Sequence, residues 1–346
     1  MAIEPGREGS LPARPPGGTA LLRAAPSRSH AAERGAIGVV APGNADPSVD
    51  RDMVVMLSDF LLAADNGLRF GSTPPRDTVA SVVTVNGRPG PVAAKVPPRS
   101  RLRLRLANAS VQRLMVVSCV GARPMVAAID GQPCELFAPA RNAVPIGPGA
   151  RYDLLLDMPE AASASVRFTL KPTLAINGKL EPERELLLLS TEGVAPPAKP
   201  PMTAQPADAD LPARIPLESA QRVDLTFDGR PGTPTTPPAG WTVNSISGLA
   251  AEKPVLTVRR GNAVVLGLTN ASPTLLPLRI GGQAVRLLHA RDDGWEPYWR
   301  DTLLLPPKGQ AHEAFVADAV GRWPIDSGFD DLTLAGASCW FTVTSG

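Results

Sequence analysis

The sequence is poor in histidine and cysteine, the residue types that dominate transition-metal sites. Its 346 residues include three histidines and three cysteines, Cys119, Cys134 and Cys339. The cysteines are too few and too irregularly spaced for a disulfide framework, and no Cys-x-x-Cys pair suggests zinc. We interpret them as partly buried free thiols.

The chain also lacks a surplus of one charge and a long apolar run. Lys and Arg total 35 against 33 Asp and Glu, a formal charge of +2, which argues against a nucleic-acid partner. No run approaches the ~20 apolar residues of a transmembrane segment. The apolar patch Ala20–Leu22 is shorter than the ~7 residues of a signal-peptide core. We therefore expect no nucleic-acid partner, no transmembrane segment and no signal peptide in this chain.

Proline and glycine, by contrast, are plentiful, at 39 and 31 residues. They separate short apolar runs such as Ile37–Val40 and Met53–Leu57, which predicts many short strands. Residues Arg101–Leu106 alternate charged and apolar side chains, so we expect one face of that strand in the core and the other in water. The pattern predicts an all-β fold of sandwich type.

Composition and repetition divide the chain. Residues 1–35 are predicted to be disordered because they lack periodicity, and residues 193–221 form a Pro-rich linker that we expect to be extended rather than packed. The segments between and after them, 36–192 and 222–346, repeat one another. Thr84–Asn86 and Asn108–Ser110 recur in the same order as Thr242–Asn244 and Asn270–Ser272, which predicts two tandem Greek-key sandwiches.

At this point the chain resembles the multicopper oxidases, whose domains are cupredoxin-like β-sandwiches. Residues 36–192 resemble their middle domain, through Asp130–Pro133 and Gly149–Asp153. Residues 222–346 resemble their last domain, through Trp241–Asn244, Arg300–Thr302 and Gly321–Trp323. Most of the first domain is absent from the resemblance. Proteins of this family are commonly periplasmic or secreted, but the sequence leaves the location of this chain open.

The resemblance also identifies positions where the family holds copper. A His-Pro-x-His-x-His motif corresponds to residues 276–281, and a His-Cys-His motif with a further His and an axial residue corresponds to residues 326–337. The degenerate former ligand positions are Leu276, Arg279, Gly281, Asp326, Ser327, Gly328, Leu332 and Ala337. A blue copper site needs a thiolate and two imidazoles, so we expect no metal, no cofactor and no catalytic residue here.

Further predictions concern the histidines, an aspartate cluster and the residues at the aligned ligand positions. His30 is either a remnant ligand position or, as we favour, a histidine in a flexible tail, while His289 and His312 lie at no ligand position. Asp326, Asp330 and Asp331 could form an oxygen-rich metal site, but we favour a solvated acidic loop. We expect Leu276, Ser327, Leu332 and Ala337 to form an apolar plug, and Arg279 to pair with Asp326.

The function expected from these observations is that of a multicopper-oxidase-like protein without copper, acting as a binding or scaffold module or as a truncated remnant. The alternative is a copper-dependent oxidoreductase whose ligands come from a partner chain or an N-terminal domain. A face left by the missing first domain would be apolar, so we expect a homodimer or a protein partner there.

Overall fold

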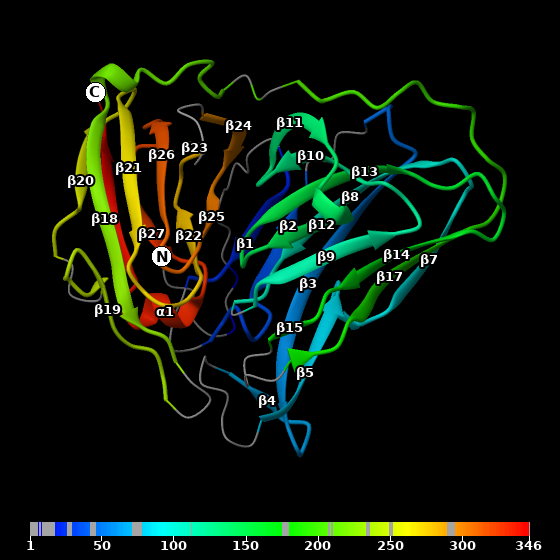
Figure 1. Cartoon of the computed structure of the whole chain (residues 1–346), viewed down its shortest axis with the longest axis horizontal. Helices are drawn as coiled ribbons and strands as arrows, with labels where there is room; N and C mark the ends of the chain where they lie inside the picture. Colours follow the sequence, from blue (N-terminus) through cyan, green and yellow to red (C-terminus); the bar gives the residue numbers. More distant parts are fainter. Residues whose placement is uncertain are drawn as a thin grey trace.

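The computed structural model confirms an all-β fold with two tandem sandwiches. It describes the chain except residues 1–5, 7, 9–17, 26–29, 42–45, 71–77, 112, 175–179, 207, 209, 233–235, 249–251, 289–294 and 346. The two sandwiches lie side by side, and the linker runs from one to the other along one end of the molecule (Figure 1). No helix in the described ranges is long and apolar enough to cross a membrane.

The first sandwich packs a large mixed sheet against a five-stranded sheet. Its strands are β3 (Arg51–Ala63), β4 (Leu68–Arg69), β5 (Thr78–Val85), β6 (Arg88–Pro89), β7 (Val92–Val96), β8 (Arg101–Asn108), β9 (Met115–Val120), β10 (Met125–Ile129), β11 (Gln132–Phe137), β12 (Ala143–Ile146), β13 (Arg151–Asp157), β14 (Ser165–Leu170) and β17 (Arg184–Thr191). The large sheet has the order β11-β10-β13-β8-β3-β5-β6 with β4 paired to β3, and the small one has the order β12-β9-β14-β17-β7. Leu57, Leu104 and Phe168 are among the buried side chains between the sheets.

The second sandwich has the same plan. Its elements are β18 (Gln221–Arg230), β19 (Ala239–Val243), β20 (Leu256–Arg259), β21 (Ala263–Asn270), β22 (Leu276–Ile280), β23 (Val285–Leu288), β24 (Trp295–Arg300), β25 (Thr302–Leu305), β26 (Gln310–Val316), β27 (Gly321–Ser327), α1 (Asp330–Leu334) and β28 (Ser338–Thr344). The sheet orders are β19-β18-β21-β26-β23-β24 and β20-β28-β27-β22-β25. Trp241, Phe227 and Phe341 are buried in its core.

Four short elements lie outside the two sandwiches. The strands β1 (Ala20–Arg23) and β2 (Ile37–Val40) pair as an antiparallel ribbon, and β15 (Thr173–Leu174) pairs with β16 (Leu180–Glu181). Two 3-10 turns, η1 (Ala140–Asn142) and η2 (Leu217–Ser219), complete the elements of the described ranges. In Figure 1 the β1–β2 ribbon lies where the two sandwiches meet.

The repeated sequence motifs occupy equivalent places in the two sandwiches. Asn86 has a φ of 51°, accepts a bond from the Met56 amide and donates to the Val54 carbonyl. Asn244, with a φ of 50°, makes the corresponding bonds to Thr226 and Asp224. Asparagine tolerates this left-handed conformation better than most residues. The asparagine recurs because, in both sandwiches, its side chain hydrogen-bonds the same tight turn to the equivalent neighbouring strand.

The predicted alternation of β8 holds for its apolar face but not for its charged face. Arg101, Arg103 and Arg105 are buried, as is the rest of the strand. They pair with carboxylates, including Asp157 and Asp153. The prediction that this face lies in water is wrong because other segments of the chain cover it.

Two of the covering segments were predicted to be unpacked. Within residues 1–35, predicted to be disordered, the described part includes β1, and the buried Thr19 hydroxyl donates to Asp153 at 2.7 Å. In the linker, Gln205 accepts a bond from Arg103, and Ile215 packs against the second sandwich. The linker has little regular structure, as expected, but it is packed, because its apolar and amide side chains find partners on both sandwiches.

Candidate functional site

The residues that the resemblance aligns with blue-copper ligands form a closed apolar plug in the core of the second sandwich. Leu276, Leu332 and Ala337 belong to one buried cluster, and Ser327 beside them is fully buried. The Ser327 amide donates to the Ala337 carbonyl at 3.1 Å, and the Ala337 amide donates to Leu332 at 2.8 Å. The four residues therefore converge, as predicted, although they come from β22, β27, α1 and the turn before β28.

The predicted ion pair between Arg279 and Asp326 is present. These residues face one another across β22 and β27, and Nη2 of Arg279 lies 2.7 Å from Oδ1 of Asp326. A second pair adjoins it, between Arg23 of β1 and Asp330 of α1. Burial lowers the pKa of Arg23, and the nearby Arg279 lowers it further. The four side chains form a compact, partly buried cluster in which each charge has an opposite partner.

This second pair corrects the prediction of a solvated acidic loop. Asp326, Asp330 and Asp331 are all buried, and the first two are ion-paired with arginine. Burial raises the pKa of Asp330, while Arg23 opposes the shift. The sequence predicted exposure because the cationic partners of Asp326 and Asp330 lie 47 and 307 positions away along the chain.

These residues do not fit copper. Leu276, Leu332 and Ala337 offer no donor atom, and the Ser327 hydroxyl accepts a hydrogen bond from the Phe329 amide. A guanidinium remains protonated and repels a dication. Proline rings also crowd two of the positions that the resemblance aligns with imidazoles. A Cβ on Gly281 would lie 2.7 Å from Pro324, and one on Gly328 would lie 2.9 Å from Pro277, so neither position accepts a side chain without repacking.

The remaining residues with metal-binding chemistry lie apart. His30 sits in an ordered turn, stacks on Phe70 and lies 3.0 Å from Glu33, so the prediction of a flexible tail is wrong for it. His312 is exposed on β26, and His289 lies outside the described residues. Across the described part of the chain, no three His, Cys, Asp or Glu side chains are grouped as a metal site would require.

The three cysteines are free and buried, as predicted. Burial raises the pKa of Cys119 to about 11 and that of Cys134 to about 12. Cys339 lies near the apolar plug, and burial raises its pKa to about 12, with a smaller contribution from Asp326. A thiolate is therefore disfavoured at all three positions, although it is the form that binds metals.

A polar junction holds the two sandwiches together. The Arg151 guanidinium, on β13, binds both carboxylate oxygens of Asp301 in the second sandwich, at 2.8 and 2.7 Å. Asp130 accepts bonds from the Asp301 and Thr302 amides, both at 3.0 Å. Arg151 also donates to the Thr19 carbonyl. The motifs around Asp130 and Asp301 therefore belong to a structural junction.

Glu313 is a buried acid that sequence reasoning missed. It lies on β26 with no exposed surface, and neither carboxylate oxygen accepts a hydrogen bond from any described residue. Burial raises its pKa to about 8, opposed by Arg300 and reinforced by Asp130 and Asp301. Burial of a charge in such surroundings is costly, so Glu313 is a neutral acid over much of the physiological range. No pattern in β26 distinguishes it from an outward-facing glutamate.

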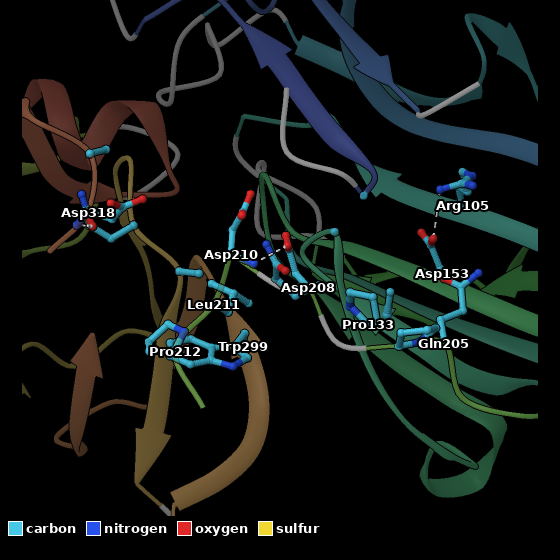
Figure 2. Close-up of a pocket in the computed structure, with 18 of the residues that line it drawn as sticks. Arg105, Pro133, Asp153, Gln205, Asp208, Asp210, Leu211, Pro212, Trp299 and Asp318 are labelled. Atoms are coloured by element: carbon cyan, nitrogen blue, oxygen red, sulfur yellow. Dashed lines mark hydrogen bonds and ion pairs between the residues drawn. The ribbon is translucent and has the colours of Figure 1, made fainter. Parts of the chain in front are cut away.

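A polar cavity lies between the two sandwiches, under the linker. We call it the interdomain cavity; it has a volume of about 860 Å³. Figure 2 shows Arg105 and Asp153 of the first sandwich on one side, Trp299 and Asp318 of the second on the other, and the linker residues Asp208 and Asp210 between them. Sequence analysis missed this cavity because its walls come from three segments that no local pattern connects.

Comparisons with known proteins agree with this architecture. Residues 214–346 match the family model described as multicopper oxidase. A multicopper oxidase from Pseudomonas thermotolerans is 24% identical, with a TM-score of 0.73 over 90% of this chain and 73% of that chain. One from Aquifex aeolicus is 16% identical, with a TM-score of 0.76 over 95% and 76%. One from Pseudomonas parafulva is 21% identical, with a TM-score of 0.74 over 95% and 78%.

A search of curated proteins found no match. The structural similarities, all at low identity, establish the cupredoxin-like fold of both sandwiches.

Proposed function

Because residues 214–346 match the multicopper oxidase family model and the chain has the cupredoxin-like fold of the solved oxidases, we propose that it acts without copper, as a binding or scaffold protein. The observation that carries the proposal is the pairing of Arg279 with Asp326 at two former ligand positions. By the resemblance, Arg279 corresponds to one imidazole ligand of the family and its counter-ion Asp326 to another.

Energetics support the same conclusion. Seating a copper ion there would separate the Arg279–Asp326 pair and leave the guanidinium buried beside a dication, and breaking a buried pair costs about 3–5 kcal/mol. The aliphatic plug adds no ligand that could offset this cost. A copper-dependent oxidoreductase whose ligands come from another chain is less well supported, because such ligands would still have to replace the plug.

Copper uptake tests the proposal directly. The full chain is incubated with Cu(I) or Cu(II) and dialysed, and bound copper, visible absorption and phenol oxidation are measured. We expect no stoichiometric copper, no intense blue band and no oxidation. The matched control is the L276H/S327C/L332H variant, which restores a thiolate and two imidazoles in the plug and should gain copper if it remains folded.

A second comparison separates surface binding from binding in the core. The H30Q/H289Q/H312Q variant lacks every histidine of the chain, so weak copper binding that disappears in it comes from scattered imidazoles. Stoichiometric copper with a blue band or oxidase activity in the unmodified chain would overturn the proposal and favour the oxidoreductase.

The scaffold role includes an interaction surface on the β1–β2 ribbon. Leu22 and Val40 have exposed fractions of 66% and 37%, and they lie on the same face because Leu22 pairs with Gly38, two residues before Val40. We infer that a second copy of the chain covers this face. Light scattering during size-exclusion chromatography should show a dimer that the L22D/V40D variant loses. A monomer for the unmodified chain at high concentration would contradict this inference.

A further inference from the structure

The interdomain cavity contains buried polar groups that no neighbouring residue satisfies. Gln132 comes from the first sandwich and Gln283 from the second, each with an exposed fraction of 7%. Oε1 of Gln132 and Nε2 of Gln283 have no hydrogen-bond partner among the described residues. The other end of Gln283 is held, because its Oε1 accepts a bond from the Asp318 amide. Orphaned buried polar atoms are rare in native proteins and require an explanation.

The two orphaned atoms differ in what they need, since Oε1 of Gln132 requires a hydrogen-bond donor and Nε2 of Gln283 an acceptor. The charge of the cavity wall indicates what could satisfy the Gln132 oxygen. Its ionisable lining residues are five aspartates and two arginines, namely Asp46, Asp153, Asp208, Asp210, Asp318, Arg103 and Arg105. The arginines are already paired with Asp46 and Asp153, and Asp318 pairs with Arg260 at the rim. The remaining negative charge comes from Asp208 and Asp210, both carried by the linker.

From these features we propose that the interdomain cavity binds a small organic cation that carries two or more amino groups. The two linker carboxylates supply charge and acceptors, and the Gln132 oxygen supplies a third, buried acceptor on the first sandwich. A metal ion fits less well, because no three potential ligands converge in the part of the chain that the structure describes. A flexible cation with separated N–H donors instead matches acceptors spread over the linker and the first sandwich.

The size of the cavity fits this class of ligand. Pockets for small molecules typically enclose roughly 300–1,000 Å³ and often lie between domains, and this one encloses about 860 Å³. The indole of Trp299, which lines it, already holds the Arg286 guanidinium at 4.5 Å from its ring centre. Because the linker forms one wall, a bound cation would also join the linker to the first sandwich. This inference goes beyond the copper-free role and does not depend on it.

The test uses the full chain and spermidine as the probe. Isothermal titration at low salt should give saturable one-to-one binding that weakens as salt is added. The D208N/D210N variant removes both linker charges but keeps the side-chain shape and the Oδ1 atom of residue 208, which accepts a bond from the amide of residue 210. Its affinity for spermidine should fall about tenfold or more. The matched control is D224N/D228N, which removes two exposed charges from the outer strand β18 and should bind as the unmodified chain does.

Two further measurements make the outcome decisive. The Q132L variant removes the orphaned acceptor and should weaken spermidine binding. It should not lower the unfolding temperature of the free protein, because no described residue loses a hydrogen bond to that oxygen. Hydrogen exchange should slow in the linker around residues 203–212 when spermidine is bound. Absence of saturable binding, equal loss in both charge variants, or preference for the neutral trisaccharide maltotriose would overturn the proposal.

Discussion

Replacing Glu313 by glutamine should remove a pH dependence that the buried acid imposes on the whole protein. Burial raises the pKa of Glu313 from 4.5 to about 8. The folded protein therefore keeps a proton that the unfolded chain releases between about pH 4.5 and 8. Because the folded-state pKa is the higher one, the contribution of Glu313 to stability is greatest at acidic pH and is lost as pH rises towards 8.

The magnitude follows from the shift in pKa. Each unit is about 1.4 kcal/mol, so the free energy of unfolding of the unmodified chain should fall by on the order of 4 kcal/mol between pH 5 and 8 through this one residue. The E313Q variant carries a neutral side chain of the same size at every pH. It should match the unmodified chain near pH 5 and exceed it by most of that amount at pH 8.

Urea denaturation of both proteins at pH 5, 6.5 and 8 measures the effect, and the difference between them cancels other titrating groups. The E160Q variant is the matched control, because Glu160 is exposed. It should show the pH profile of the unmodified chain. If E313Q also kept that profile, Glu313 would be ionised in the folded protein and the reasoning from its burial would be refuted.

Three further predictions concern pairing and burial. The R151M variant should lower the free energy of unfolding by about 3–5 kcal/mol, because it leaves the buried Asp130 carboxylate without its cationic partner and also breaks the pair with Asp301. Calorimetry should then resolve separate transitions for the two sandwiches; a single unshifted transition would contradict the junction. The R23A variant should lower the free energy of unfolding by about 3 kcal/mol, because it leaves Asp330 buried without its cationic partner. Chemical denaturation should show that R23A/D330N recovers part of that loss; no recovery would mean that the lost ion pair is not the cause. The three thiols should resist a thiol-specific reagent at pH 8 until urea unfolds the chain, since burial raises every thiol pKa to about 11 or 12; rapid labelling of the folded protein, detected by mass spectrometry, would contradict this.

The sequence by itself determined the fold class, the duplication and the lack of donor atoms on residues such as Leu276 and Leu332. Strand alternation and turn residues are local properties, so Asn86 and Asn244 predict equivalent turns from the sequence alone. The absence of a donor atom on Leu276 or Leu332 is likewise a property of the residue alone. The Arg279–Asp326 pair could be predicted because the resemblance supplied the register between two strands.

Only the tertiary structure decided which charges are buried and where separate segments meet. The arginines of β8 alternate as an exposed face would, yet the linker and the segment containing Thr19 cover them. No local sequence pattern predicts the burial of Glu313 or the interdomain cavity, since the residues that surround them are distant in sequence. The physical reason is that desolvation and pairing depend on every group within a few ångströms, and a linear pattern records only the neighbours along the chain.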